Sequence, residues 1–172
     1  MSNIALPSES AAAQPRNGAK SSGWRASAAI VPGGSRPGCA VSGGDLSGLD
    51  AAVHAAAAAD VVVLAVGDRA GLFGGGTSGE GCDAEDLNLP GHQSELVEAI
   101  LQAGRPTVLV VVSGRPYAVG QYRGRAAAIV QAFFPGEEGG RALAGVLSGR
   151  VNPSGKLPVE VPRHAGAQPH TY

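Results

Sequence analysis

Short apolar runs alternate with helix-like patterns along most of the chain. Residues 60–66 read Asp-Val-Val-Val-Leu-Ala-Val, a nearly continuous β-branched run. Such runs are typical of strands buried on both faces of a parallel sheet. Residues 106–112 and 127–133 repeat the pattern. The sequence therefore predicts three strands, the first two of them buried.

Between these runs, apolar residues recur at the spacing of a helix. Ser47 stands three positions before Asp50, at the spacing of a capping box, and predicts a helix that extends to about Ala59. Apolar residues at helical spacing predict a second helix that ends near Gly104 and a third over residues 137–148. Strands that alternate with helices in this way predict the α/β class, as a three-layer α/β/α sandwich with a mostly parallel sheet.

The two ends of the chain are less regular. Residues 1–28 are rich in Ala, Ser, Pro and Gly and predict a disordered leader, and residues 30–44 predict one short strand or an extended linker. Residues 157–161 read as an edge strand, because the prolines within and after this run exclude it from the centre of a sheet. We expect a sandwich domain over residues 29–163 and the start of a linker to an absent downstream region over residues 164–172.

Length, composition and charge narrow the class of ligand. The 172 residues fit one domain, and the formal net charge of −1 gives no basic surface for nucleic acid or an anionic membrane. No stretch approaches the roughly 20 apolar residues of a membrane span. We therefore expect an uncharged partner, with no nucleic acid and no membrane among the binding partners.

The cysteines and the N-terminal sequence indicate which cellular compartment to expect for the chain. Cys39 and Cys82 lack the spacing of a metal-binding pair and are too few for a disulfide framework. The chain has no cluster of His, Cys and Asp that indicates a metal, and no N-terminal segment with the features of a signal peptide. We expect reduced thiols, no metal or cofactor, and a cytoplasmic location.

A long Gly-rich loop over residues 67–91 follows the first predicted strand. Ligands of parallel sheets approach the carboxyl ends of the strands, where this loop begins. The loop contains no lysine, and its carboxylates would repel a phosphate, so a nucleotide site is excluded. The carboxylates in question are Glu80, Asp83, Glu85 and Asp86. They suit a hydroxyl-rich ligand, although spacing alone favours a solvated acidic loop that ties down a helix start.

Four sequence motifs follow one another along the chain, and this loop contains the first of them. The loop motif runs from Ser78 as Ser-Gly-Glu-Gly-Cys-Asp and continues to Leu-Pro-Gly-His-Gln at residues 89–93. Ser-Gly-Arg-Pro follows at residues 113–116, Phe-Pro-Gly-Glu-Glu-Gly-Gly at residues 134–140, and Val-Asn-Pro-Ser-Gly-Lys-Leu-Pro at residues 151–158. Together they resemble the C-terminal α/β sandwich domain of glycoside hydrolase family 3, and four ordered motifs are far more specific than one.

The resemblance implies a retaining β-glycosidase of the β-glucosidase or β-xylosidase type. In many members of that family the nucleophile is an aspartate of an N-terminal (β/α)₈ barrel, and the acid/base is a glutamate of this loop, which Glu80 matches. Retaining chemistry needs the two carboxyls about 5–5.5 Å apart, so the loop must reach the sugar across a domain interface, and its glycines permit such a reach. One position departs from the family, since Ala84 stands where an arginine is frequent.

Further candidates flank Glu80. Asp83 either orients Glu80 or binds a sugar hydroxyl, or else it caps the turn that starts the next helix. Asp68 follows the first predicted strand and is a candidate substrate contact, with an Asx turn as the plainer alternative. Arg115 follows the second predicted strand and either pairs with an acidic residue near the domain interface or fixes the loop.

A (β/α)₈ barrel needs about 250 residues, more than the chain holds upstream of Ala40. The resemblance therefore implies a C-terminal domain that supplies the acid/base, is inactive alone, and acts with an absent barrel domain on terminal β-linked glucose or xylose. Two alternatives stay open. One is a non-catalytic module that binds carbohydrate or a partner, and the other is an inactive truncated product.

Overall fold

The computed structural model describes residues 28–31 and 34–167. Apart from Ala28, the expected leader lies outside these residues, as do residues 168–172 of the expected linker. Five strands form one sheet in the order β2-β1-β3-β4-β5. The strands are β1 Ala28–Val31, β2 Gly34–Pro37, β3 Val62–Gly67, β4 Thr107–Val112 and β5 Ala128–Gln131.

The three predicted strands form the parallel part of the sheet, and the third of them, β5, is exposed or half-buried. β3 pairs with β4 in a register that places Val62 opposite Thr107, and β4 pairs with β5 with Val108 opposite Ala128. β1 pairs antiparallel with both β2 and β3. The segment expected to hold one short strand or a linker therefore holds β2 and half of β1, and the two strands form a hairpin that extends the sheet beyond β3.

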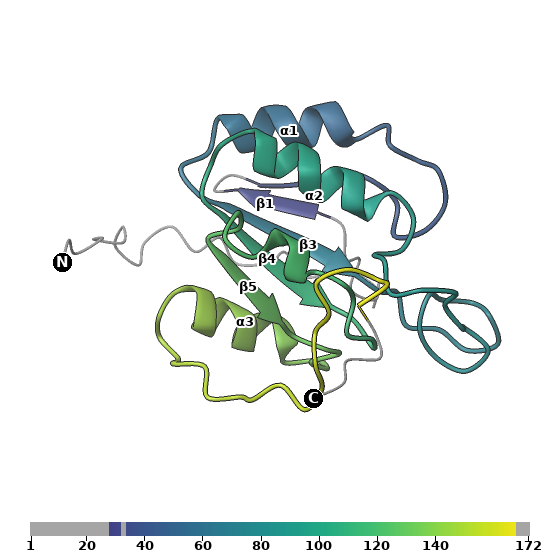
Figure 1. The fold of residues 1–172 in the computed structure, drawn as a ribbon. Coiled ribbons are helices and arrows are strands. Elements are labelled where there is room, and N and C mark those ends of the chain that lie inside the picture. Colours follow the sequence, from purple (N-terminus) through teal and green to yellow (C-terminus); the bar gives the residue numbers. More distant parts are fainter. Residues whose placement is uncertain (1–27, 32–33, 168–172) are drawn as a thin grey trace.

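Helices cover both faces of the sheet (Figure 1). The helices are α1 Leu49–Ala57, α2 Gln93–Gln102 and α3 Gly139–Leu147, and a short 3₁₀ helix, η2, spans Gly120–Tyr122. One face of β3 and β4 packs against α1 and α2, and the opposite face packs against Leu143 of α3. Side chains alternate between the faces of a strand, so each strand supplies both layers. The three-layer α/β/α expectation is confirmed.

Two local expectations are wrong. Ser47 and Asp50 form no capping box, because Gly48 is the N-cap of α1 and the Ser47 N–H donates instead to Asp45 Oδ1 at 2.9 Å. Residues 157–161 form no strand. Pro158 within the run and Pro162 after it lack a backbone N–H, and the chain returns over η2, where the Gly120 N–H donates to Pro162 O at 3.1 Å.

None of the helices in the described ranges is long and apolar enough to cross a membrane.

Both cysteines are buried, and neither forms a disulfide. Burial raises the pKa of the Cys39 thiol to about 11, and the negative charges of Asp45 and Glu95 add to the effect. Because both side chains are buried, we expect neither cysteine to react with an aromatic disulfide reagent in the native state and both to react in denaturant. Release of one equivalent of chromophore from the native protein within seconds would contradict this burial.

Candidate functional site

The loop after β3 projects beyond the carboxyl ends of β3 and β4 (Figure 1). We call residues 68–91 the Glu80 loop. The loop follows Gly67, the last residue of β3, whose φ of +131° lies in a region that favours glycine. A Cβ atom at Gly67 would overlap the backbone of Val112 on the neighbouring strand. The base of the loop is therefore fixed by close contact between two backbones.

The loop folds back on itself. The Thr77 N–H donates to Arg69 O at 2.8 Å, and the Gly71 N–H donates to Ser78 O at 3.0 Å, so its outgoing and returning limbs are paired. Gly79 has a φ of +135°, and a Cβ there would overlap the carbonyl oxygen of Gly71. The glycines before Glu80 thus allow two limbs to pack closely, a role that the sequence did not reveal.

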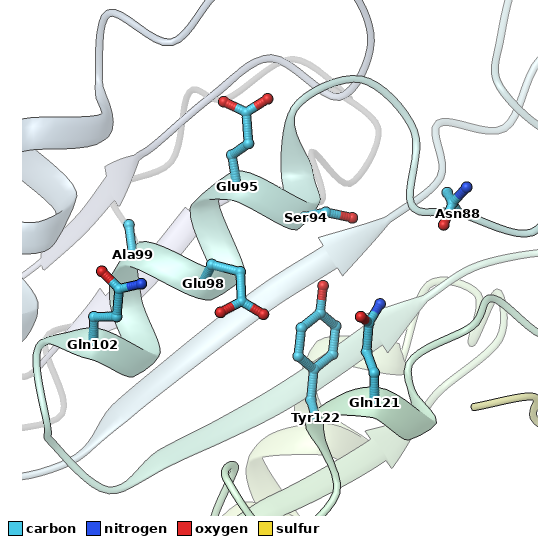
Figure 2. A pocket seen from close by; sticks show the side chains of 8 residues that line it. All are labelled: Asn88, Ser94, Glu95, Glu98, Ala99, Gln102, Gln121 and Tyr122. Atoms are coloured by element: carbon cyan, nitrogen blue, oxygen red, sulfur yellow. The ribbon is translucent and has the colours of Figure 1, made fainter. Parts of the chain in front are cut away.

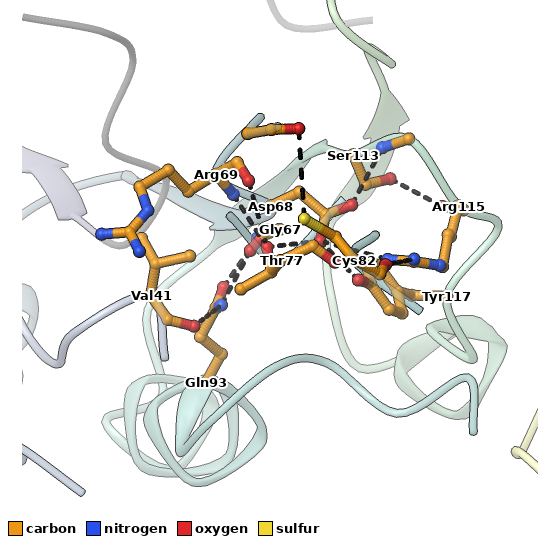
Figure 3. Close-up of polar contacts among 12 residues, drawn as sticks. Val41, Gly67, Asp68, Arg69, Thr77, Cys82, Gln93, Ser113, Arg115 and Tyr117 are labelled. Carbon is orange, nitrogen blue, oxygen red and sulfur yellow. Dashed lines mark hydrogen bonds and ion pairs between the residues drawn. The ribbon is translucent and has the colours of Figure 1, made fainter. Parts of the chain in front are cut away.

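Asp68 lies beneath the loop with a fully buried side chain (Figure 3). Its Oδ1 accepts hydrogen bonds from Tyr117 Oη at 2.5 Å and Thr77 Oγ1 at 2.8 Å, and its Oδ2 accepts from the Gly114 N–H at 2.9 Å. These bonds cross from β3 to the loop and to the segment after β4, so they form no Asx turn. Any direct contact between Asp68 and substrate would require some of these bonds to break.

The buried Asp68 carboxylate also affects the pKa of Tyr117. Burial raises the pKa of the Tyr117 hydroxyl, and its hydrogen bond to Asp68 raises the pKa further. Tyr117 therefore stays protonated and keeps donating to Asp68 across the neutral pH range.

Arg115 holds the returning limb of the loop (Figure 3). Its Nη1 donates to Thr77 O at 2.5 Å, and its Nη2 donates to Cys82 O. Nη1 also lies 4.0 Å from Asp68 Oδ1. Arg115 therefore fixes the loop, as one of the two alternatives from the sequence expected, and its acidic neighbour is the buried Asp68.

Glu80 lies between the two carbonyl groups that Arg115 binds. The residue is exposed, and its carboxylate has no hydrogen-bond partner among the described residues. An exposed carboxyl on an anchored segment can give a proton to a ligand, or take one from it, when that ligand approaches from outside the domain. This is the acid/base chemistry for which Glu80 was singled out.

Asp83 is also exposed, and within the described part of the chain its side chain forms no hydrogen bond. It does not cap the next helix, because α2 begins at Gln93 with His92 as its N-cap. The turn-forming role belongs to Asp86, whose Oδ1 accepts from the Asn88 N–H at 2.8 Å. The role of Asp83 as an orienting residue or sugar ligand stays a prediction.

Gln93 is a structural residue of the site that the sequence did not single out. It is fully buried in the first turn of α2, where its Oε1 accepts from the Gly67 N–H at 2.6 Å. Its Nε2 donates to Gly67 O at 2.8 Å and to Val41 O at 2.9 Å. The amide thereby joins α2 to the end of β3. The sequence signal for this structural role was the position of Gln93 in the Leu-Pro-Gly-His-Gln motif.

A polar groove lies beside α2 and η2 (Figure 2). It is lined by Asn88, Ser94, Glu95, Glu98, Ala99, Gln102, Gln121 and Tyr122. Its carboxylates already have partners: Glu95 Oε1 lies 2.5 Å from His92 Nδ1, and Glu98 accepts two hydrogen bonds from Arg125. These bonds hold the pKa of Glu98 below its usual value. The groove therefore lacks the free carboxyl that the Glu80 loop provides.

Over the ranges described, no three His, Cys, Asp or Glu side chains gather as metal ligands would.

The domain is an open α/β sheet with a carboxylate-bearing loop at the carboxyl ends of its parallel strands, the end at which ligands of such sheets bind. The family model described as "Glycosyl hydrolase family 3 C-terminal domain" matches residues 1–172, and the chain belongs to this family.

Named relatives agree with the family. A periplasmic beta-glucosidase from Salmonella typhimurium is 42% identical over 124 residues, which are 72% of this chain and 16% of the relative. A beta-xylosidase from Formosa agariphila is 39% identical over 135 residues, which are 78% of this chain and 18% of the relative. The chain thus spans less than a fifth of the length of these glycoside hydrolases.

Solved structures share the fold. A β-glucosidase from Erythrobacter marinus matches with a TM-score of 0.65 and 36% identity, covering 80% of this chain and 21% of that one. The β-glucosidase from Listeria innocua in complex with glucose also matches with a TM-score of 0.65, at 32% identity, covering 77% of this chain and 18% of that one. The region matched by this chain is therefore a small part of each of these two longer proteins.

Proposed function

We propose that this domain supplies the acid/base residue of a retaining β-glycosidase that hydrolyses terminal β-linked glucose or xylose. The sugar class rests on the relatives, which are named beta-glucosidase and beta-xylosidase. Glu80 is the acid/base in this proposal. The nucleophile is an aspartate of a (β/α)₈ barrel domain outside the chain.

The observation that carries the proposal is the state of Glu80. Its carboxylate is exposed and unpartnered among the described residues, while the segment around it is tied to Arg115 through Thr77 and Cys82. A general acid must have its proton within hydrogen-bond reach of the leaving oxygen, and rigid backbone around it lowers the cost of holding that position.

The tip of the Glu80 loop also supports contact with another surface. Leu72 and Phe73 at this tip are 65% and 84% exposed. Adjacent large apolar side chains with this exposure often mark a surface that is covered in an assembly. A barrel domain seated against the tip would bring Glu80 towards a sugar held on the barrel.

Glu80 acts in both steps of the proposed reaction. In the first step the aspartate attacks the anomeric carbon, the glycosidic bond breaks, and Glu80 gives its proton to the departing oxygen. In the second step Glu80, now a carboxylate, takes a proton from water as the water attacks the glycosyl-enzyme. The sugar leaves with its β configuration retained, and Glu80 is protonated again.

Complementation tests this function. Hydrolysis of aryl β-glucosides and β-xylosides would be measured for the chain alone, for a family 3 barrel domain alone, and for the two mixed or fused. We expect turnover only when both are present. Turnover by the chain alone would contradict the proposal. A fusion no more active than the barrel alone, combined with glycan binding that Glu80→Gln leaves unchanged, would instead support a non-catalytic module.

A further inference from the structure

Arg115 bridges the two ends of the short segment that contains Glu80. We call residues 77–82 the Glu80 segment. One guanidinium donates to the carbonyl oxygen of Thr77, three positions before Glu80, and to that of Cys82, two positions after it. Because the guanidinium is planar with fixed donor directions, binding both carbonyls fixes their separation and orientation.

Asp68 in turn orients Arg115 and Thr77. Its buried carboxylate lies 4.0 Å from Arg115 Nη1 and accepts the Thr77 hydroxyl at 2.8 Å. Thr77 Oγ1 also accepts the Arg69 N–H at 2.9 Å, so this hydroxyl links the carboxylate to the outgoing limb of the loop. The Glu80 segment is thus anchored from below, and the Glu80 side chain is left exposed.

We propose that Arg115 is a positioning residue for Glu80: by bridging Thr77 O and Cys82 O, with Asp68 behind it, it holds the acid/base carboxyl at one place over the sheet. This inference rests on the proposed function for its catalytic consequence. Its structural part, the immobilisation of residues 77–82, concerns this chain alone.

Hydrogen exchange on the chain tests the structural part. The amides of Thr77, Ser78 and Cys82 donate hydrogen bonds within the loop and report its opening. In Arg115→Lys the single ammonium cannot keep both carbonyls in the same geometry, and we expect these amides to exchange about tenfold faster or more. Arg125→Lys is the matched control, since Arg125 pairs with Glu98 outside the loop, and it should leave the exchange unchanged.

Thr77→Val provides a second variant if Arg115→Lys does not fold. It removes the hydroxyl that joins Asp68 Oδ1 to the Arg69 N–H and keeps a β-branched side chain. We expect the same amides to exchange faster. Unchanged exchange in the Glu80 segment of a folded Arg115→Lys or Thr77→Val protein would overturn the proposal.

The catalytic part of the proposal is tested in the enzyme complemented with a barrel domain, by comparing substrates that differ in their leaving group. A displaced acid hinders departure of a basic leaving group more than that of an acidic one. For Arg115→Lys we expect kcat/KM to fall about tenfold or more on a phenyl β-glycoside and by less than about threefold on a 2,4-dinitrophenyl β-glycoside. An equal loss on both substrates would overturn the positioning role. If the native complemented enzyme is inactive, the proposed function fails, and the exchange result decides the positioning alone.

Discussion

Asp68→Ala should lower the free energy of unfolding by about 3 kcal/mol or more, because it removes a buried charge that several groups share. The carboxylate accepts from Thr77, Gly114 and Tyr117 and lies beside Arg115. After its removal the buried Tyr117 hydroxyl is left without its acceptor, and the partly buried hydrogen bonds from Thr77 and Gly114 are lost as well.

Urea unfolding of the chain followed by circular dichroism measures this loss. Asp60→Ala is a suitable control, since Asp60 is exposed just before the opposite end of β3 and should change the free energy by less than about 0.5 kcal/mol. A free energy for Asp68→Ala within about 1 kcal/mol of the native value would show that the network does not hold the loop.

Glu80→Ala should lower turnover of a phenyl β-glycoside by the complemented enzyme about 10²- to 10⁴-fold, because proton donation to the leaving oxygen is lost. The loss on a 2,4-dinitrophenyl glycoside should be far smaller in the glycosylation step, since that phenolate leaves without a proton. Stability should hardly change, because Glu80 is exposed.

Stopped-flow release of the phenol separates glycosylation from the later hydrolysis of the intermediate. Glu85→Ala is the matched control, because Glu85 is another exposed acid of the same loop. Equal losses for the two variants would mean that the loop acts through its net charge, and Glu80 would have no special role.

The sheet was largely predictable from the sequence, whereas the hairpin was not. Continuous apolar runs located β3 and β4, because a strand buried on both faces has few other solutions, and a shorter run located β5, which is exposed or half-buried. β1 and β2 contain only four residues each, too few to show a period, and they follow Pro- and Gly-rich sequence. The antiparallel edge of the sheet was therefore missed.

The anchoring of the Glu80 loop could be predicted only in part. The motif located Glu80, and the position of Arg115 after a strand end allowed a loop-fixing role. The enclosure of Asp68 depends on Tyr117 and Gly114, which lie 49 and 46 positions away, and no local pattern reveals such contacts. The close packing of Gly71 and Gly79 is likewise a tertiary contact, so their sequence indicated only freedom of the backbone.

Azide rescue of Glu80→Ala tests the central claim most directly. The variant would be complemented with a family 3 barrel domain and given a 2,4-dinitrophenyl β-glycoside with and without sodium azide, and the sugar product would be identified by NMR. Azide needs no general base to attack the glycosyl-enzyme, so we expect faster turnover and a β-glycosyl azide from Glu80→Ala alone. The native pair and Glu85→Ala should give only free sugar. Native-like hydrolysis by Glu80→Ala, with no glycosyl azide, would contradict the assignment of Glu80 as the acid/base.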